Sequence, residues 1–113
     1  MYETLIVGGG PAGLTAAIYA ARAGKHVAVL ERGSTGGQII SAPLVENYPG
    51  IPSVSGTELA RQMTEQACTF GAEIVYTEAV GLGKTPAGFR VLCTHGRSEE
   101  HTSELQSPGD LVC

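Results

Sequence analysis

The chain has 113 residues, of which 42% are hydrophobic and 16% are charged, and its net charge is −4. That balance is typical of one soluble globular domain with a single core. It excludes a membrane span, because no apolar run is long enough, and a basic nucleic-acid surface. Three scattered histidines and three distant cysteines predict neither a metal site nor a disulfide framework. Because no basic leader precedes residues 5–7, we expect a cytoplasmic protein without a signal peptide.

The first predicted elements are a strand, a helix and a second strand. Residues 4–7 form a short β-prone run that ends in glycines, which is typical of a buried parallel strand. A helix that ends at Gly24 is predicted by four apolar residues spaced along one helix face, Leu14, Ala17, Ile18 and Ala21. Residues 26–30, H-V-A-V-L, predict a second strand, which Glu31 closes.

A long irregular segment follows, because residues 33–53 are rich in Gly, Pro and Ser. Ser55 predicts the start of a second helix, and Glu58 completes a capping box with it. The expected buried stripe of this helix is Leu59, Met63, Ala67 and Phe70. Three short strands are predicted after it, over residues 73–76, 80–82 and 89–93.

This order of elements predicts an α/β protein that contains part of a Rossmann-type FAD/NAD(P)-binding fold. We expect three layers, with a parallel sheet and a small β meander made by the last two strands. The domain is expected to cover residues 1–96, and residues 97–113 form a separate tail.

The glycines at the first junction of strand and helix have the pattern Gly8-x-Gly10-x-x-Gly13. Between a strand and a helix, this pattern indicates a dinucleotide site. Gly8 permits the tight turn, Gly10 lets a pyrophosphate approach the backbone, and Gly13 lets helix and strand pack closely. The helix start adds unpaired N–H groups and a partial positive charge, and Pro11 costs little there.

Glu31 completes the predicted site, because it stands eighteen residues after Gly13 at the end of the second strand. A carboxylate at this place can accept hydrogen bonds from both ribose hydroxyls. It would repel a 2′-phosphate, which disfavours NADP at this turn, although the neighbouring Arg32 weakens that inference. The alternative is a glycine-rich loop with an incidental surface glutamate.

Five segments occur along the chain in a specific order: V-G-G-G-P-A-G-L-T-A-A-I-Y-A-A-R-A-G, E-R-G, G-G-Q, V-E-N-Y-P-G and S-G-T-E-L. Together they resemble the N-terminal FAD-binding domain of bacterial-type, low-molecular-weight thioredoxin reductases. The resemblance extends from Met1 to about Gly96, and V-E-N-Y-P-G separates this family from other Rossmann proteins. It implies that the first glycine motif binds FAD, whereas NADPH binds a second motif in a later, inserted domain.

The resemblance also implies which residues hold FAD. The residues that would hold the pyrophosphate are Gly9, Gly10, Pro11 and Ala12. Glu31 would hold the adenosine ribose, and the backbone of Val80 would meet the adenine. The residues that would meet the flavin half are Gly37, Gln38 and Asn47. For Gln38 and Asn47 the alternative is turn chemistry, since Asn before Tyr-Pro-Gly is a good turn former.

In that family, a homodimer passes electrons from NADPH through the flavin to a C-x-x-C, and then to the disulfide of thioredoxin. This chain contains neither a C-x-x-C nor the NADPH motif, so we expect it to have no catalytic residues and no activity by itself. Cys68 and Cys93 are expected to be buried packing cysteines. Two alternatives stay open for the parent: a ferredoxin/flavodoxin-NADP reductase-like flavoprotein without the dithiol, or a non-catalytic nucleotide-binding fragment.

The tail does not resemble the family. Residues 97–107, R-S-E-E-H-T-S-E-L-Q-S, match the translation of a common sequencing-library adapter, and the match resumes within residues 110–113. We therefore expect a gene truncated near Gly96 and fused to adapter read-through, with a disordered tail. The truncation is expected to leave the first strand without a partner on its far side. The alternative is a genuine polar, disordered extension.

Overall fold

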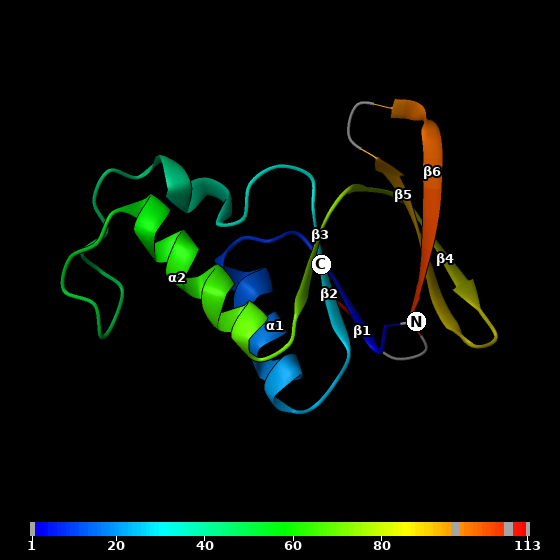
Figure 1. The fold of residues 1–113 in the computed structure, drawn as a ribbon, viewed down its shortest axis with the longest axis horizontal. Helices are drawn as coiled ribbons and strands as arrows, with labels where there is room; N and C mark the ends of the chain where they lie inside the picture. Colours follow the sequence, from blue (N-terminus) through cyan, green and yellow to red (C-terminus); the bar gives the residue numbers. More distant parts are fainter. Residues whose placement is uncertain (1, 96–97, 108–109, 113) are drawn as a thin grey trace.

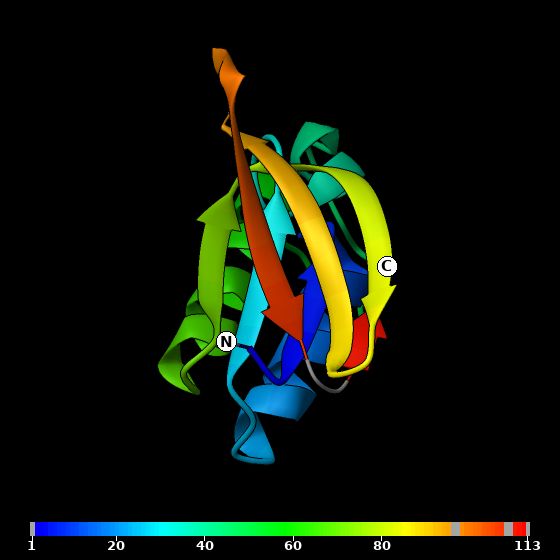
Figure 2. The ribbon, with the colours of Figure 1, turned by 90° about the vertical axis from the view of Figure 1, so that its right-hand side faces the viewer.

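The computed structural model describes residues 2–95, 98–107 and 110–112, and it has three layers (Figure 1). The helices α1 (Pro11–Arg22) and α2 (Gly56–Thr69) cover one face of a parallel sheet of strand order β3-β2-β1-β7. An antiparallel sheet of order β4-β5-β6 covers the other face (Figure 2). The predicted three-layer α/β fold, with a parallel sheet and a β meander, is confirmed.

The parallel sheet consists of β1 (Thr4–Val7), β2 (Val27–Glu31), β3 (Glu73–Tyr76) and β7 (Asp110–Val112). The central strands β1 and β2 are apolar except for Thr4 at the start of β1 and Glu31 at the end of β2, because both faces of the sheet are covered. Alternate side chains therefore enter two separate cores. The helix side of the sheet contributes Ile6, Val27 and Val29. The meander side contributes Leu5, Ala28 and Leu30.

Helix α1 buries the stripe that its sequence predicts. The four buried residues are Leu14, Ala17, Ile18 and Ala21. The helix ends at Arg22 with Ala23 as its C-cap, and the next residue, Gly24, has a φ of +84°, the left-handed conformation that glycine adopts without strain. This part of the prediction is confirmed.

Helix α2 begins as predicted, since the Ser55 hydroxyl accepts a hydrogen bond from the Glu58 N–H at 3.1 Å. The return half of the capping box is not formed, because the Glu58 carboxylate pairs with Arg61 instead. Hydrogen bonds from Arg61, and then from Gln62, lower the pKa of Glu58 to about 2. Only the first half of the predicted box is therefore confirmed.

The buried stripe of α2 is shorter than predicted. Leu59, Met63 and Ala67 are buried, but Phe70 is 41% exposed and Cys68 is exposed. Phe70 falls at the C-cap, after the last helical turn, and its ring lies 5.5 Å from the Arg22 guanidinium. Cys68 follows Ala67 by one position, which turns it about 100° away from the core. The prediction of burial for both residues was wrong.

The irregular segment before α2 contains a short 3-10 helix, η1 (Gly37–Ser41), and two isolated antiparallel bridges, Val45 to Val54 and Tyr48 to Ile51. Gly56 lets η1 approach α2 closely, because a Cβ there would stand 1.6 Å from the Ile39 carbonyl oxygen. The segment is therefore packed against α2 and closed on itself by two bridges.

The meander is longer than predicted, with β4 over Glu78–Thr85 and β5 over Gly88–His95. Val91 and Cys93 are buried against the parallel sheet and make the second core. The hydroxyl of buried Thr77 donates to the Thr94 carbonyl, which ties the start of β4 to the end of β5.

Two strands lie within the tail. Backbone of β6 (Ser98–Ser107) pairs antiparallel with β5, and β7 pairs parallel with β1. The far side of the first strand, expected to be unpartnered, is therefore paired with residues 110–112. An edge strand presents unpaired N–H and C=O groups, and another segment of the chain can form backbone hydrogen bonds with them. The expected adapter origin of the tail stays a prediction.

Three side chains meet at the amino ends of the first three strands. The Tyr2 hydroxyl donates to Glu73 Oε2 at 2.6 Å, and His26 Nε2 lies 3.4 Å from Glu73 Oε1. The Tyr2 and His26 rings stand 4.6 Å apart, centroid to centroid. The hydrogen bond from Tyr2, and then that from His26, lower the pKa of Glu73, and the same bond to Glu73 raises the pKa of Tyr2.

We predict that Tyr2→Phe destabilises the chain in a pH-dependent manner. Because the pKa of Glu73 is lowered in the folded chain, its ionised carboxylate stabilises the fold at pH values above the ordinary glutamate pKa of about 4.3. This stabilisation is lost as the pH falls through the pKa of the folded state. Because Glu73 is half exposed, the loss at pH 7 is expected to stay below about 1 kcal/mol. Thermal melts at pH 7 and pH 3 measure it, with Tyr19→Phe as the control for an exposed tyrosine. An equal loss at both pH values would contradict the prediction.

Candidate cofactor-binding site

The glycine turn joins β1 to α1 at the carboxyl edge of the parallel sheet. Gly8 has a φ of +101°, and its N–H donates to the Leu30 carbonyl of the neighbouring strand at 2.8 Å. A Cβ on Gly13 would stand 2.0 Å from the Gly8 carbonyl oxygen, which no side chain can tolerate. The roles predicted for Gly8 and Gly13, the tight turn and the close packing of helix on strand, fit this geometry.

The start of α1 leaves room and donors for an anion. Gly10 is the N-cap residue, and a Cβ there would meet nothing within 4 Å. The first bond of the helix runs from the Leu14 N–H to the Gly10 carbonyl at 2.9 Å. The N–H groups of Ala12 and Gly13 precede it and have no intrahelical acceptor, while Pro11 has no N–H to satisfy. These residues fit a pyrophosphate, because two donors and the positive helix end face open space.

Glu31 is held by the backbone at the end of β2. Its two carboxylate oxygens accept hydrogen bonds from the Gly9 N–H at 2.8 Å and the Gly33 N–H at 2.7 Å. Gly9 is therefore turned toward Glu31 and its N–H is not open to a phosphate. Each carboxylate oxygen has a further lone pair, so Glu31 can still accept from ribose hydroxyls.

The segment of Gly36 to Gln38 lies against the glycine turn. The Gly36 N–H donates to the Gly9 carbonyl at 2.6 Å, and a Cβ on Gly37 would stand 3.3 Å from Gly10 Cα. Gly36 has a φ of +104° and touches α2, where its Cβ would lie 2.4 Å from the Ala60 Cβ. The structure therefore brings Gly37, the first residue of η1, beside Gly10, and exposed Gln38 follows it.

Asn47 and Val80 are placed further out. Asn47 is exposed in the loop between the two isolated bridges. Its neighbour Tyr48 lines an open apolar hollow together with Pro11 and Ala12 from the start of α1, so this loop lies near the helix end. Val80 is 54% exposed on β4 and does not line the hollow beside Glu31. The roles expected of these two residues stay predictions.

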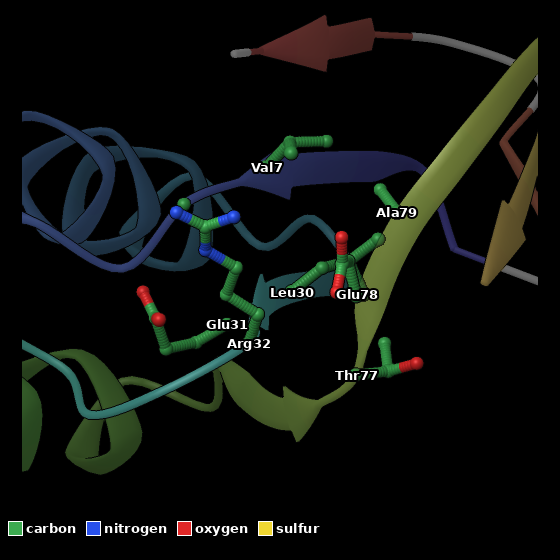
Figure 3. Close-up of a pocket in the computed structure, with 8 residues that line it drawn as sticks. Val7, Leu30, Glu31, Arg32, Thr77, Glu78 and Ala79 are labelled. Carbon is green, nitrogen blue, oxygen red and sulfur yellow. The ribbon is translucent and has the colours of Figure 1, made fainter. Parts of the chain in front are cut away.

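A hollow of about 260 Å³ opens beside Glu31, between the ends of β1 and β2 and the start of β4 (Figure 3). The residues that line it are Val7, Gly8, Leu30, Glu31, Arg32, Thr77, Glu78 and Ala79. No motif in the sequence predicted Thr77, Glu78 or Ala79 as residues of this site. Their position directly after β3 could have indicated them, because ligands of open α/β sheets bind at the carboxyl ends of parallel strands.

The described cysteines form no dithiol. Cys68 is exposed on α2, and Cys93 is buried in the second core, where burial raises the pKa of its thiol. Cys113 lies outside the described residues. Within residues 2–95, 98–107 and 110–112, no group of three His, Cys, Asp or Glu side chains is placed to hold a metal ion. None of the helices described is long and apolar enough to cross a membrane.

Comparisons with known proteins point to one family. The family model described as "Pyridine nucleotide-disulphide oxidoreductase" matches residues 2–105. The thioredoxin reductase of Bacillus subtilis is 49% identical over 76 residues, which are 67% of this chain and 24% of that protein. The crystal structure of thioredoxin reductase from Streptococcus pyogenes matches with a TM-score of 0.85 at 38% identity, over 99% of this chain and 34% of that one.

A third relative carries a different name. The crystal structure of a ferredoxin-flavin thioredoxin reductase from Clostridium acetobutylicum matches with a TM-score of 0.79 at 27% identity. The match covers 98% of this chain and 36% of that one. The chain thus spans about a quarter to a third of the length of these three relatives.

We predict that two alanine substitutions in the glycine turn lower the stability of the ligand-free chain by unequal amounts. Gly13→Ala forces the helix away from the Gly8 carbonyl and is expected to cost about 3 kcal/mol of unfolding free energy. Gly10→Ala meets only open space and is expected to cost less than about 1 kcal/mol. Urea unfolding of both variants at pH 7 measures the difference. Equal stabilities would show that the turn is not constrained as described.

Proposed function

The chain belongs to the pyridine nucleotide-disulphide oxidoreductase family, and we propose that it is the FAD-binding portion of a thioredoxin reductase. One observation carries the proposal: the glycine turn, the open start of α1 and Glu31 lie together at the carboxyl edge of one parallel sheet. The names of all three relatives above support it.

Different residues would bind different parts of the proposed cofactor. The N–H groups of Ala12 and Gly13 would bind the pyrophosphate over Gly10, where no Cβ stands in the way. Glu31 would accept from the ribose while it also holds the Gly9 N–H. Gly37 lies beside Gly10, so Gln38 would extend toward the flavin side, as Asn47 would from its loop. When bound, FAD supplies the carrier of electrons, and these residues bind and orient it.

For the longer parent protein, we propose NADPH-dependent reduction of the thioredoxin disulfide in a cytoplasmic homodimer. Thioredoxin and NADPH are then its partners. The 113 residues contain no C-x-x-C, and the described cysteines lie in different elements, so the chain itself is proposed to bind cofactor without catalysing turnover.

A second candidate for the parent is a flavoprotein that takes electrons from another donor. The likeness to the ferredoxin-flavin thioredoxin reductase favours it, although that match has lower identity than the Streptococcus pyogenes one. A ferredoxin/flavodoxin-NADP reductase-like flavoprotein without the dithiol belongs to this candidate class, and a non-catalytic nucleotide-binding module is a further alternative.

One sequencing experiment separates the parent activities and also tests the origin of the tail. We propose that residues 97–113 are adapter read-through, since they match adapter codons and carry four acids against one arginine. Genomic DNA should then continue with reductase codons after Gly96, and a C-x-x-C further on would support the thioredoxin reductase. The same tail in genomic DNA would overturn the adapter origin, and a parent without C-x-x-C would favour the second candidate.

We predict that the chain binds FAD and that Gly10→Ala weakens this binding by more than about tenfold, because the methyl group displaces charge-assisted hydrogen bonds to the phosphates. Equilibrium dialysis against FAD measures the dissociation constant. Gly83→Ala on β4 is the control, since its Cβ would make only ordinary contacts with Arg90. Unchanged affinity in Gly10→Ala would overturn the proposed phosphate position.

A further inference from the structure

The loop that follows β2 is held between α2 and the glycine turn. On one side, the Gly36 N–H donates a hydrogen bond to the Gly9 carbonyl at 2.6 Å. On the other side, Gly36 lies directly on α2, because a Cβ there would stand 2.4 Å from the Ala60 Cβ. A Cβ on Gly37 would stand 3.3 Å from Gly10 Cα, so the loop also reaches the N-cap of α1. The position of the loop on α2 therefore sets where it meets the glycine turn.

Thr35, directly before Gly36, contacts both of these surfaces with its side chain. Its methyl group, Cγ2, lies 3.3 Å from the position that a Cβ on Gly9 would take. Its hydroxyl lies 2.9 Å from the hydroxyl of Thr64 on α2, and both threonines are half-buried. Thr64 stands one helical turn after Ala60, so both contacts of the loop fall on the same face of α2.

The Thr64 hydroxyl is itself fixed to the helix. It lies 2.7 Å from the carbonyl oxygen of Ala60 as well as 2.9 Å from Thr35 Oγ1. A hydroxyl has one proton, and a carbonyl oxygen can only accept. Both hydrogen bonds therefore form together when Thr64 donates to Ala60 and Thr35 donates to Thr64. This pair of hydroxyls ties the loop to a helix that its own buried residues hold on the sheet.

We propose that Thr35 and Thr64 are positioning residues for the dinucleotide, and that their hydroxyl pair holds the loop of residues 33–37 against the glycine turn before the ligand binds. The inference deepens the proposed function and rests on it. Through the loop, the pair acts on Gly9, whose N–H donates to Glu31 at 2.8 Å. A loop released from α2 would leave these groups free to take other arrangements, and the arrangement that binds the cofactor would be populated less.

The test separates the hydroxyl of Thr35 from its methyl group. Thr35→Val keeps the methyl group against Gly9 and removes the hydroxyl, whereas Thr35→Ser keeps the hydroxyl and removes the methyl group. Thr64→Val removes the partner hydroxyl on α2. Thr69→Val, at the exposed last residue of the same helix, is the control for valine in place of threonine. Circular dichroism checks that each variant is folded.

Two measurements are made on the whole chain. Hydrogen exchange of the Gly36 N–H without ligand reports how firmly the loop lies on the glycine turn, because this group is bonded to the Gly9 carbonyl. Equilibrium dialysis gives the dissociation constant for FAD. We expect Thr35→Val to exchange about five- to tenfold faster at Gly36 and to bind FAD about threefold more weakly or worse.

The other variants sharpen the expectation. Thr64→Val should match Thr35→Val, and the double variant should be no worse than either single variant, because each removes the same hydrogen bond. Thr35→Ser and Thr69→Val should stay within about twofold of the wild type in both measurements.

The outcomes distinguish a positioning role from a merely structural one. If Thr35→Val exchanges faster at Gly36 but binds FAD as tightly as the wild type, the pair only packs the loop, and the proposal is overturned. Unchanged exchange in both valine variants, or a loss in Thr35→Ser equal to that in Thr35→Val, would overturn it as well. A wild-type chain that binds no FAD overturns the proposed function and the positioning role with it, while the exchange of Gly36 still shows whether the pair holds the loop.

Discussion

The close contact of α1 with the end of β1 is the constraint on which the rest of the site depends. A Cβ on Gly13 would stand only 2.0 Å from the Gly8 carbonyl oxygen. Because Gly13 has none, the first turn of the helix can lie directly on the glycine turn that precedes it. This fixes the open helix end at the carboxyl edge of the sheet. Glu31 from β2 and Gly36 from the following loop then bind the two polar groups of Gly9, its N–H and its carbonyl. Three segments of the chain thus meet on one turn.

The glutamate side chains of the sheet differ in their hydrogen-bond partners. Glu31 is held by two backbone N–H groups and orders the turn, whereas Glu78 faces the same hollow with no partner among the described side chains. Glu73 joins Tyr2 and His26 at the opposite edge of the same sheet. Because parallel strands all present their carboxyl ends to one edge, the sheet separates the glycine turn and Glu31 from the cluster of Tyr2, His26 and Glu73.

Local patterns predicted much of the fold. The buried stripe of α1, the Ser55 cap and the short apolar strands follow from neighbours within a turn or a pleat, which the sequence contains directly. The predicted burial of Phe70 was wrong because the helix ends just before it. The end of a helix is set by local capping and not by the spacing of its apolar residues. The predicted burial of Cys68 was wrong because an apolar residue type does not by itself indicate which face of the helix the residue lies on. The strands in the tail could not be predicted, since their pairing depends on edges formed by distant residues.

The sequence by itself determined the turn between β1 and α1, because glycines at three set positions between a strand and a helix permit only a narrow range of backbone geometries. It also determined that Glu31 stands at the end of β2. Only the tertiary structure decided what Glu31 binds, why Gly36 and Gly56 must lack side chains, and which residues of β4 complete the hollow. These depend on contacts between residues far apart in the chain, where packing and hydrogen-bond satisfaction of the whole fold select the partners.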